Sequence, residues 1–486
     1  MGIVFKQSFH NTLILFLGFT IGGLNVLFLY THFLEAEYFG LITFLLSTAN
    51  LIMPLLVFGM QHTIIKFFSS YQHKQEQDNF MLTAVLLPML IIVPMAILGV
   101  LFYHQIATFL ARENIIIEKY TYTIFFTSIF MGYFEVFYAW SRVQMKSVFG
   151  NFVKEVFARI CVSVLLFAVY FDWIDSEQFI YAVVIVYMLR MMIMKLYAFY
   201  LYFPKIEWKG LPKNIKEILS FSLYIIMAGS AGTILLEIDK FMIPQMTHIA
   251  EVAYYSVGVY IASVIGIPSR AMQQIINPIT AHELNKNNMT EVKNLYQKSS
   301  LNLLIVGGLL FLLINTNIED LYKIINKEEY LVGIYVVLVI SISELIKLSI
   351  GTNGAILTNS KYYKMLFYYA IGMSFTVVIL NRVLIDFMGI QGAALATLIV
   401  VALFSFLKII YVNKKMNMQP FTPKTMMLLL IIAFLFMVFY FIEFPFNSYL
   451  NILIKSSLIT VIFIFLVVKL KLSVDMNQMI DRYFMK

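Results

Sequence analysis

The sequence has little charge and almost no cysteine. Charged residues make up 13% of its 486 positions and apolar residues 61%, whereas soluble domains average about 25% and about 45–50%. Such a chain could not cover a water-facing surface with polar groups, which excludes a soluble enzyme, a secreted disulfide-stabilised domain and a disordered protein. The single cysteine, Cys161, excludes an intrachain disulfide. The class that remains is a polytopic membrane protein, in which lipid solvates most of the surface.

Several functional motifs are also absent from the sequence. It contains no G-x-x-x-x-G-K-[ST] loop, so nothing supports ATP-driven transport. The seven histidines lack the spacing of metal ligands, and no potassium-filter sequence occurs. A net charge of +8 would indicate nucleic-acid binding in a soluble protein, but here the placement of the charges between apolar runs matters more than their sum. We therefore expect no metal, no cofactor and no nucleic-acid partner.

Long apolar runs fill most of the chain. A spanning helix needs about 20 apolar residues, and these runs are continuous and about twice as long as the strand of a membrane β-barrel. We predict an all-α polytopic membrane protein with about fourteen transmembrane helices, the first of them a retained helix and not a cleaved signal peptide. The expected spans are 9–31, 38–60, 80–103, 120–141, 150–171, 178–203, 217–244, 250–276, 298–316, 330–357, 362–385, 388–412, 424–444 and 449–470.

Lysine and arginine are distributed unevenly among the loops. With the N-terminus placed inside, and with most basic residues toward a helix end counted with the adjoining segment, 25 of the 35 basic residues are assigned to inner segments, five to outer segments and five to the spans themselves. The positive-inside rule therefore predicts that both termini are cytoplasmic. A missed helix would disturb this alternation, so the asymmetry also favours an even number of helices.

A weak internal repeat predicts two groups of six helices. Residues 35–40 resemble residues 251–256, and residues 141–151 resemble residues 357–367, at the same offset. Because each half holds an even number of helices, the halves are expected to point the same way. The alternative is chance similarity between apolar segments. The predicted organisation is an N-lobe at 1–203, a basic cytoplasmic linker at 204–216, a C-lobe at 217–412, and helices 13 and 14 with a cytoplasmic tail at 413–486.

Three segments carry a resemblance to a known superfamily. They are Glu37-Tyr38-Phe39-Gly40-Leu41 continuing to Phe58-Gly59-Met60-Gln61, then Ile238-Asp239-Lys240-Phe241 followed by Glu251-Val-Ala-Tyr254-Tyr255-Ser, and Gly389-Ile-Gln-Gly392-Ala-Ala-Leu-Ala-Thr397. They resemble the MOP flippase superfamily in its polysaccharide-exporter branch, which includes Wzx-type O-antigen flippases. The chain departs from the family at Ala253, where glycine is usual. The resemblance implies a V-shaped, two-lobed, MATE/MOP-like transporter that moves lipid-linked oligosaccharide across the bacterial inner membrane.

Charged residues within the expected spans are the candidate site. A charge at the centre of a spanning helix costs about 2.5–3.5 kcal/mol, so it is expected to face water or an opposite charge. Candidates for binding the diphosphate of the lipid carrier are the cations Arg159, Arg190, Lys240 and Lys347. Candidates for binding a coupling proton or sodium ion are the acids Glu135, Glu237, Asp239 and Glu344.

A structural interpretation of the same charges stays open. The pairs Glu155–Arg159, Glu237–Lys240 and Glu344–Lys347 are three or four residues apart, so each could be a self-neutralising pair on one helix face. Asp239 and Lys240 could instead be interfacial groups at the helix end. Arg190 and Glu135 have no local partner, and for Arg190 this favours a functional role. Lys455 is expected to extend to the membrane interface.

The sequence thus predicts a secondary transporter and not an enzyme. We expect a flippase for polyprenyl-diphosphate-linked O-antigen, capsule or exopolysaccharide repeat units, working by alternating access on a proton or sodium gradient in lipopolysaccharide or related polysaccharide biosynthesis. We expect a multi-pass monomer of the bacterial inner membrane, whose partners are the lipid-linked glycan, the bilayer and polysaccharide assembly proteins.

Three alternatives remain open. A MATE-type cation or drug antiporter usually has twelve helices and a cavity suited to cations, so the two additional helices and the intramembrane cations argue against it. An oligosaccharide polymerase is expected to carry a large outer loop, whereas the longest outer segments, 103–119 and 317–329, are short. A peptidoglycan-precursor flippase is not distinguished by the sequence.

Overall fold

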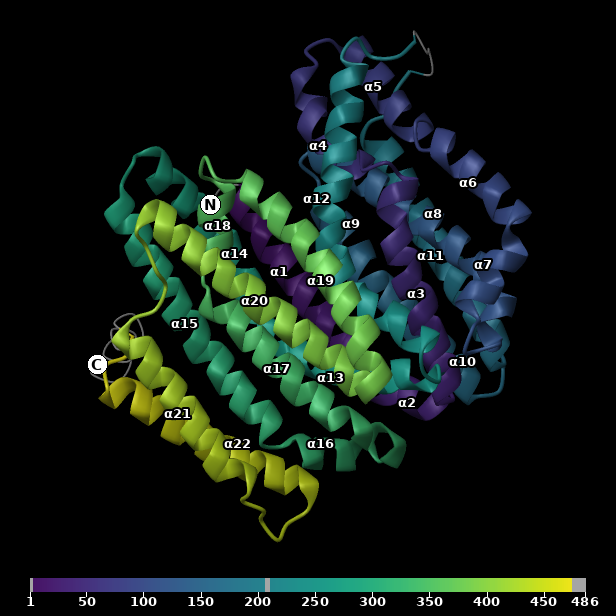
Figure 1. Ribbon diagram of the computed structural model, residues 1–486. Coiled ribbons are helices and arrows are strands. Elements are labelled where there is room, and N and C mark those ends of the chain that lie inside the picture. The colour runs from purple at the N-terminus through teal and green to yellow at the C-terminus, as the bar shows by residue number, and fades with distance from the viewer. Residues whose placement is uncertain (1–2, 206–209, 474–486) are drawn as a thin grey trace. The chain divides into compact units, whose positions relative to one another are not determined.

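The computed structural model describes residues 3–205 and 210–473, and in these residues it contains helices and no strand (Figure 1). This confirms the prediction of an all-helical membrane protein. The chain forms two compact units, Met1–Ser256 and Val257–Lys486, here called the N-terminal and C-terminal units.

The helices of the N-terminal unit include two short π-helical segments, η1 and η3. The elements are α1 Ile3–Leu24, η1 Asn25–Leu29, α2 Tyr30–Phe33, α3 Ala36–Leu56, α4 Met60–Phe67, η2 Phe68–Ser70, α5 Lys74–Leu86, α6 Met89–Leu101, α7 Tyr103–Leu110, α8 Ile116–Val143, α9 Val148–Phe152, η3 Val153–Phe157, α10 Ala158–Tyr170, α11 Ser176–Leu201, α12 Ile215–Met242 and η4 Ile243–Gln245.

The C-terminal unit begins within α13. Its elements are α13 Ala250–Ser263, η5 Val264–Gly266, α14 Ile267–Asn285, α15 Met289–Asn315, α16 Ile318–Ile325, η6 Glu328–Gly333, α17 Ile334–Ser349, α18 Asn353–Thr358, α19 Lys364–Met388, α20 Ile390–Met416, α21 Pro423–Tyr440 and α22 Ser448–Lys469.

Eleven helices in the described residues are long and apolar enough to cross a membrane. They are His10–Phe33, Ala36–Leu56, Lys74–Leu101, Ser176–Leu201, Ala250–Arg270, Met289–Asn315, Glu328–Ser349, Lys364–Met388, Ile390–Met416, Pro423–Tyr440 and Ser448–Lys469. The other three expected spans, 120–141, 150–171 and 217–244, coincide with helices α8, η3–α10 and α12. The total of fourteen spans stays a prediction.

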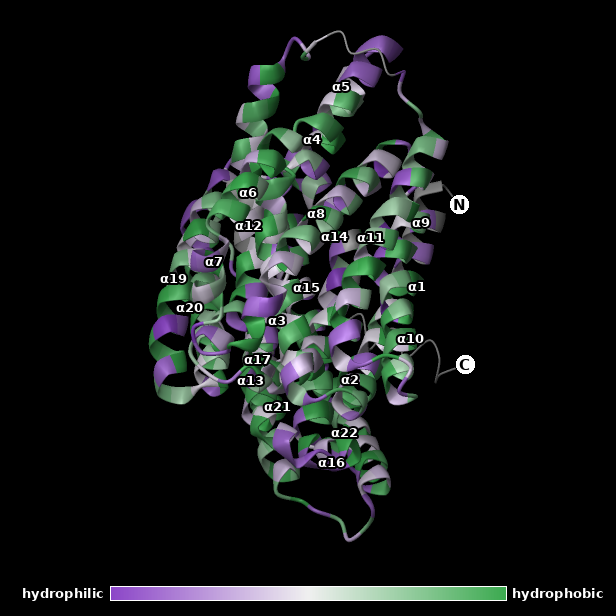
Figure 2. Ribbon diagram, turned by 90° about the vertical axis from the view of Figure 1, so that its right-hand side faces the viewer, coloured by the Kyte–Doolittle hydropathy of each residue, from purple (hydrophilic) through white to green (hydrophobic). Residues whose placement is uncertain are grey.

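Exposed apolar side chains show why lipid must surround the helices. Along α6, Leu90, Val93, Ile97 and Val100 are all exposed, and apolar colouring dominates this helix in Figure 2. Soluble monomers seldom expose contiguous apolar patches larger than a few hundred Å². Such a surface is stable where hydrocarbon chains and not water contact it. The protein is therefore a multi-pass membrane protein.

Helix α8 occupies the centre of the N-terminal unit. It packs against α3, α4 and α11, and its buried aromatic residues Phe134, Phe137 and Trp140 form much of the core between them. The indole nitrogen of Trp140 donates a hydrogen bond to the carbonyl oxygen of Tyr202 (3.2 Å), which satisfies the polar atom of a buried ring. This packing fixes the face that α8 presents to α11, on which the candidate site depends.

Helix α12 packs with the N-terminal unit. It contacts α3 and α4, and the hydroxyl groups of Thr63 and Ser222 are 2.8 Å apart across that contact. The compact units thus divide at Ser256, after α12. The predicted division of the chain stays a prediction: lobes at 1–203 and 217–412, a linker at 204–216 and a segment at 413–486. Residues 206–209 of the linker lie outside the described residues.

Two glycines in the family motifs lie where a side chain would meet backbone. A Cβ added to Gly40 of α3 would come 2.0 Å from the carbonyl oxygen of Ile249, and one added to Gly392 of α20 would come 2.0 Å from that of Leu384. Gly389 has φ 57° and ψ −137°, a conformation that is essentially restricted to glycine. Close backbone approach therefore explains glycine at positions 40 and 392, and the backbone conformation explains it at position 389.

Candidate translocation site

Arg190 lies inside the N-terminal unit, on α11, where it faces α8. Its side chain is only 8% exposed, and its guanidinium carbon lies 3.9 Å from the ring centroid of Phe134 and 5.4 Å from that of Tyr187. The Nε atom has no hydrogen-bond partner among the described residues. Aromatic faces attract a desolvated guanidinium, so they hold the cation in place and leave an N–H free for a ligand or water.

Glu135 of α8 has a partner that sequence spacing did not indicate. Its carboxylate lies 2.7 Å from the ammonium of Lys154 in η3. Lys154 is 37% exposed, although it lies within an expected span. Lys154 lies four residues from the end of this span that is predicted to be cytoplasmic, so its ammonium is expected to reach interfacial water.

Arg159 of α10 and Glu155 of η3 form the ion pair that their spacing predicts. The Nη1 atom of Arg159 donates to the Oε2 atom of Glu155 (2.9 Å) and to the Glu155 carbonyl oxygen (2.6 Å). Helix α1 approaches this pair closely: a Cβ on Gly18 would lie 2.7 Å from Nη1 of Arg159 and 2.7 Å from the same carbonyl oxygen. Because Gly18 has no side chain, the ion pair can pack directly against α1.

The π-helical segment η1 contacts α10 beside this pair. Asn25, the first residue of η1, donates from Nδ2 to the carbonyl oxygen of Arg159 (3.0 Å) and accepts from the hydroxyl of Ser163 (2.7 Å). Residues of η1 and α10 pack together, and single-turn π-helical segments occur frequently at functional sites. Asn25 satisfies a carbonyl group next to a site cation, a role that its position in an apolar run did not reveal.

Together these side chains form a cluster with an excess of positive charge. Its cations are Lys154, Arg159 and Arg190, and its acids are Glu135 and Glu155. Glu135, Glu155 and Arg159 all lie within electrostatic range of Arg190. We call this set of five residues the N-unit charge cluster. It can neutralise its two acids internally and still present one cationic group to an anion.

The remaining candidates of the N-terminal unit lie near the C-terminal end of α12. The ammonium of Lys240 is 3.0 Å from a carboxylate oxygen of Glu237, and Nδ2 of Asn50 on α3 lies 3.5 Å from the other oxygen of this carboxylate. Asp239 is buried and accepts a hydrogen bond from the hydroxyl of Tyr255. Lys240 is thus paired with an acid of its own helix, and Asp239 is paired with the hydroxyl of Tyr255 on α13.

The C-terminal unit contains the last predicted pair. The ammonium of Lys347 lies 2.7 Å from a carboxylate oxygen of Glu344 on α17. A Cβ on Gly266 would come 2.5 Å from the other oxygen of Glu344, so η5 approaches this carboxylate closely. Each of the four candidate acids therefore has a hydrogen-bonding or ionic partner within its own unit.

Lys455 does not extend to the interface, so that expectation was wrong. Its side chain is 4% exposed, and its ammonium donates to the carbonyl oxygen of Thr316 (2.9 Å). Packing of α22 against α15 and α16 encloses it, because the helix pair α21–α22 covers the end of α15. Hydropathy along α22 alone does not reveal this cover.

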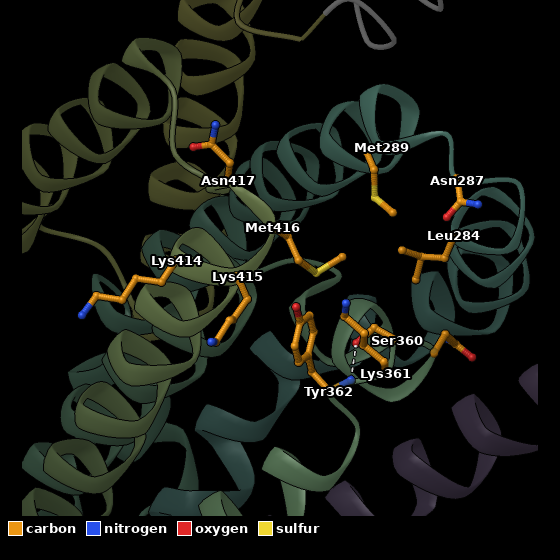
Figure 3. A pocket seen from close by; sticks show the side chains of 11 residues that line it. Leu284, Asn287, Met289, Ser360, Lys361, Tyr362, Lys414, Lys415, Met416 and Asn417 are labelled. Atoms are coloured by element: carbon orange, nitrogen blue, oxygen red, sulfur yellow. Dashed lines mark hydrogen bonds between the residues drawn. The ribbon is translucent and has the colours of Figure 1, made fainter.

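A second polar feature lies where α14, α18 and α20 end (Figure 3). The pocket has a volume of about 580 Å³, and the charged residues in its lining are Lys361, Lys414 and Lys415. Figure 3 shows Lys415 beside Tyr362, whereas Lys414 points away. These lysines are exposed at helix ends that the charge asymmetry predicts to be cytoplasmic, and they would attract an anionic headgroup.

Comparison with known proteins assigns the family. The polysaccharide biosynthesis protein family matches residues 8–281, more than half of the chain. The chain belongs to this family. This confirms the resemblance carried by the three motifs. No match was found among curated proteins.

Solved structures with the same fold are transporters and flippases. Lipid II flippase MurJ in an inward closed conformation matches with a TM-score of 0.73 at 15% identity, over 95% of this chain and 98% of that one. An inward-facing multidrug resistance MATE family transporter of the MOP superfamily matches at 0.60 and 12%, over 84% and 94%. A MOP superfamily transporter from Pyrococcus furiosus matches at 0.56 and 10%, over 85% and 96%. At these identities the similarity establishes the fold alone.

The Glu135–Lys154 pair provides a test of the N-unit charge cluster. Reversing Glu135→Lys would leave the cluster with four cations and a single acid, Glu155. We expect transport to fall about tenfold or more, equivalent to at least about 1.4 kcal/mol. The double variant Glu135→Lys/Lys154→Glu restores the pair and should recover most of the transport. If the double variant is inserted correctly but is as inactive as Glu135→Lys, the Glu135–Lys154 pair is not the interaction on which transport depends.

Proposed function

We propose that this protein is a flippase that carries a polyprenyl-diphosphate-linked glycan across the bacterial inner membrane by ion-coupled alternating access. The observation that carries the proposal is the N-unit charge cluster, with its net positive charge, in a chain of the polysaccharide biosynthesis family. Arginine and lysine make strong charge-assisted hydrogen bonds to phosphate oxygens. The buried Nε of Arg190 has no partner among the described residues, so it would gain a hydrogen bond if the diphosphate reached it.

The charge of the cluster favours an anionic substrate over a cationic drug. A cation entering beside Lys154, Arg159 and Arg190 would be repelled unless additional acids faced it. The glycan itself need contribute no charge, because the diphosphate is common to all carriers of this class. A peptidoglycan precursor on the same carrier therefore remains a second candidate, which the similarity of fold to lipid II flippase MurJ favours.

Coupling to an ion gradient would act through the paired acids. Protonation of Glu135 or Glu237 would remove the carboxylate charge that holds Lys154 or Lys240, releasing the cation to the substrate. One elementary charge moving inward gains about 2.3 kcal/mol per 100 mV. Asp239 and Glu344 are the other candidates, and no metal or organic cofactor enters the proposed cycle. We propose that the protein works as a monomer and that it supplies the translocated glycan to polysaccharide assembly proteins.

The experiment is transport by the purified protein in liposomes. The probe is a short-chain polyprenyl-diphosphate N-acetylglucosamine with a fluorophore on the lipid, whose outer-leaflet population is bleached by a membrane-impermeant reductant. Ethidium uptake tests the antiporter alternative, and the same carrier with a muropeptide tests the peptidoglycan alternative. We expect translocation of the glycan probe to depend on the imposed gradient. Ethidium uptake without glycan translocation would overturn the proposal.

The topology can be tested independently. The positive-inside rule predicts that a reporter fused after Asn288 is cytoplasmic and that one fused after Asp320 is external. These residues flank α15, one of the eleven helices long enough to span the membrane. The opposite pattern in a dual phosphatase and fluorescent reporter assay would overturn both the predicted orientation and the cytoplasmic termini.

A further inference from the structure

The C-terminal unit contains a polar pocket that the transport site does not use. It has a volume of about 390 Å³ and lies among the ends of α15, α16, α21 and α22. Small-molecule sites typically occupy about 300–1,000 Å³. Its lining includes Asn315, Asp320, Tyr440, Glu443, Asn451 and Lys455. These ends are predicted to face away from the cytoplasm, so the pocket lies on the side of the membrane to which a head group would be translocated.

Three buried polar side chains in the lining have unused hydrogen-bonding capacity. Asn315 and Asn451 are 2% and 8% exposed, and their Oδ1 atoms have no partner among the described residues. Lys455 donates to one carbonyl oxygen, whereas an ammonium has three donors. Buried polar atoms are nearly always hydrogen-bonded in proteins. A ligand that both donates and accepts hydrogen bonds would satisfy all three.

The charges of the pocket indicate the class of that ligand. Its lining contains the acids Glu319, Asp320 and Glu443 and the cations Lys323 and Lys455, and this excess of acid disfavours a phosphate. No group of three His, Cys, Asp or Glu that could hold a metal occurs in the described part of the chain. A neutral or amine-bearing ligand with many hydroxyl groups fits the donors and acceptors that remain.

Aromatic residues complete the lining on the side of α21 and the loop that follows it. Tyr440, Phe444 and Phe446 all border the pocket. Their rings offer flat apolar surface and, at Tyr440, a hydroxyl group. Sugar rings combine an apolar C–H face with a rim of hydroxyl groups that donate and accept hydrogen bonds. The lining therefore matches a saccharide in both its polar and its apolar parts.

We propose that this pocket binds a neutral or amino sugar of the transported glycan on the outward side. The inference rests on the proposed function, since the glycan is its substrate. It assigns to α21 and α22, which lie outside the predicted repeat, the role of holding the emerging head group. The site is separate from the diphosphate-binding cluster because it recognises the sugar and not the carrier.

Saturation-transfer NMR on the purified full-length protein in nanodiscs tests this assignment. The probes are N-acetylglucosamine, glucosamine and glucose 1-phosphate. We expect both uncharged and amine-bearing sugars to bind, and the phosphate to bind more weakly. Asn451→Leu should weaken sugar binding about tenfold, through loss of one acceptor and of space. The matched control Ser457→Ala, at an exposed position of the same helix, should bind as the wild type does.

A second variant distinguishes a loss of sugar binding from a folding defect. Glu443 is exposed, so Glu443→Gln should fold normally and should weaken glucosamine binding more than N-acetylglucosamine binding. Failure of the wild type to bind any of these sugars, or binding that neither variant changes, would overturn the assignment. Translocation of the lipid-linked probe is measured separately in the same preparations. Its loss in the wild type would count against the proposed function, whereas intact translocation without sugar binding would reject this pocket alone.

Discussion

Arg190→Ala is expected to reduce translocation of the lipid-linked glycan probe at least about tenfold, equivalent to about 1.4 kcal/mol or more, while leaving membrane insertion unchanged. The guanidinium lies over Phe134 and near Tyr187, and no acid forms a salt bridge with it in the described residues. Alanine removes the one cation of the N-unit charge cluster that no carboxylate neutralises. The measurement is the initial rate of probe translocation in liposomes of equal protein content.

Arg190→Lys is the matched control for this result. Lysine keeps the charge but lacks the planar fork that stacks on aromatic rings and presents several donors. We therefore expect it to restore only part of the activity. If Arg190→Ala is inserted properly and translocates the probe at the wild-type rate, Arg190 does not belong to the site. The proposed binding of the diphosphate would then lack its principal residue.

Gly40→Ala is expected to lower the free energy of unfolding by about 1–3 kcal/mol, the usual cost of overpacking, or by more. The new Cβ would lie 2.0 Å from the carbonyl oxygen of Ile249. The backbone at Ile249 cannot easily move away from the new Cβ, because hydrogen bonds fix it. The amide of Ile249 donates to Oδ1 of Asn114 (2.8 Å), and Nδ2 of Asn114 donates to the carbonyl oxygens of Pro244 (2.7 Å) and Thr247 (2.9 Å). The segment before α13 is thus fixed against α3.

Gly99→Ala provides the control for the loss of glycine itself. Gly99 lies within α6, where an added Cβ would meet no described atom within 4 Å. Alanine in a helix interior is favoured over glycine by about 1 kcal/mol, so this variant should be as stable as the wild type or slightly more so. Thermal unfolding of the purified proteins compares the two. If Gly40→Ala and Gly99→Ala are equally stable, α3 and the segment before α13 can move apart readily.

Ion pairs along one helix were predictable, and ion pairs between helices were not. Glu155–Arg159, Glu237–Lys240 and Glu344–Lys347 all form as their spacing indicates, because residues three or four apart share a helix face. Glu135 finds Lys154 from another helix. Nothing in the periodicity of either segment specifies which two helices pack together.

Polar residues that connect helices were missed for the same reason. Asn25 and Asn114 lie in or beside apolar runs, and each bonds to backbone far away in sequence. Their only local signal is a carboxamide at an otherwise apolar position. A buried carboxamide needs partners, so such a position indicates an interhelical contact, but it does not indicate where that contact lies.

The amino-acid sequence by itself determined that this chain is an all-helical membrane protein. Hydropathy suffices for that conclusion because lipid forces each spanning segment to satisfy its own backbone hydrogen bonds. Only the tertiary structure decided that Arg190 rests on aromatic rings, that Lys154 completes the charge cluster and that Lys455 is buried in a polar pocket. These are properties of contacts between helices, and such contacts depend on the shapes of packed surfaces that a one-dimensional pattern does not encode.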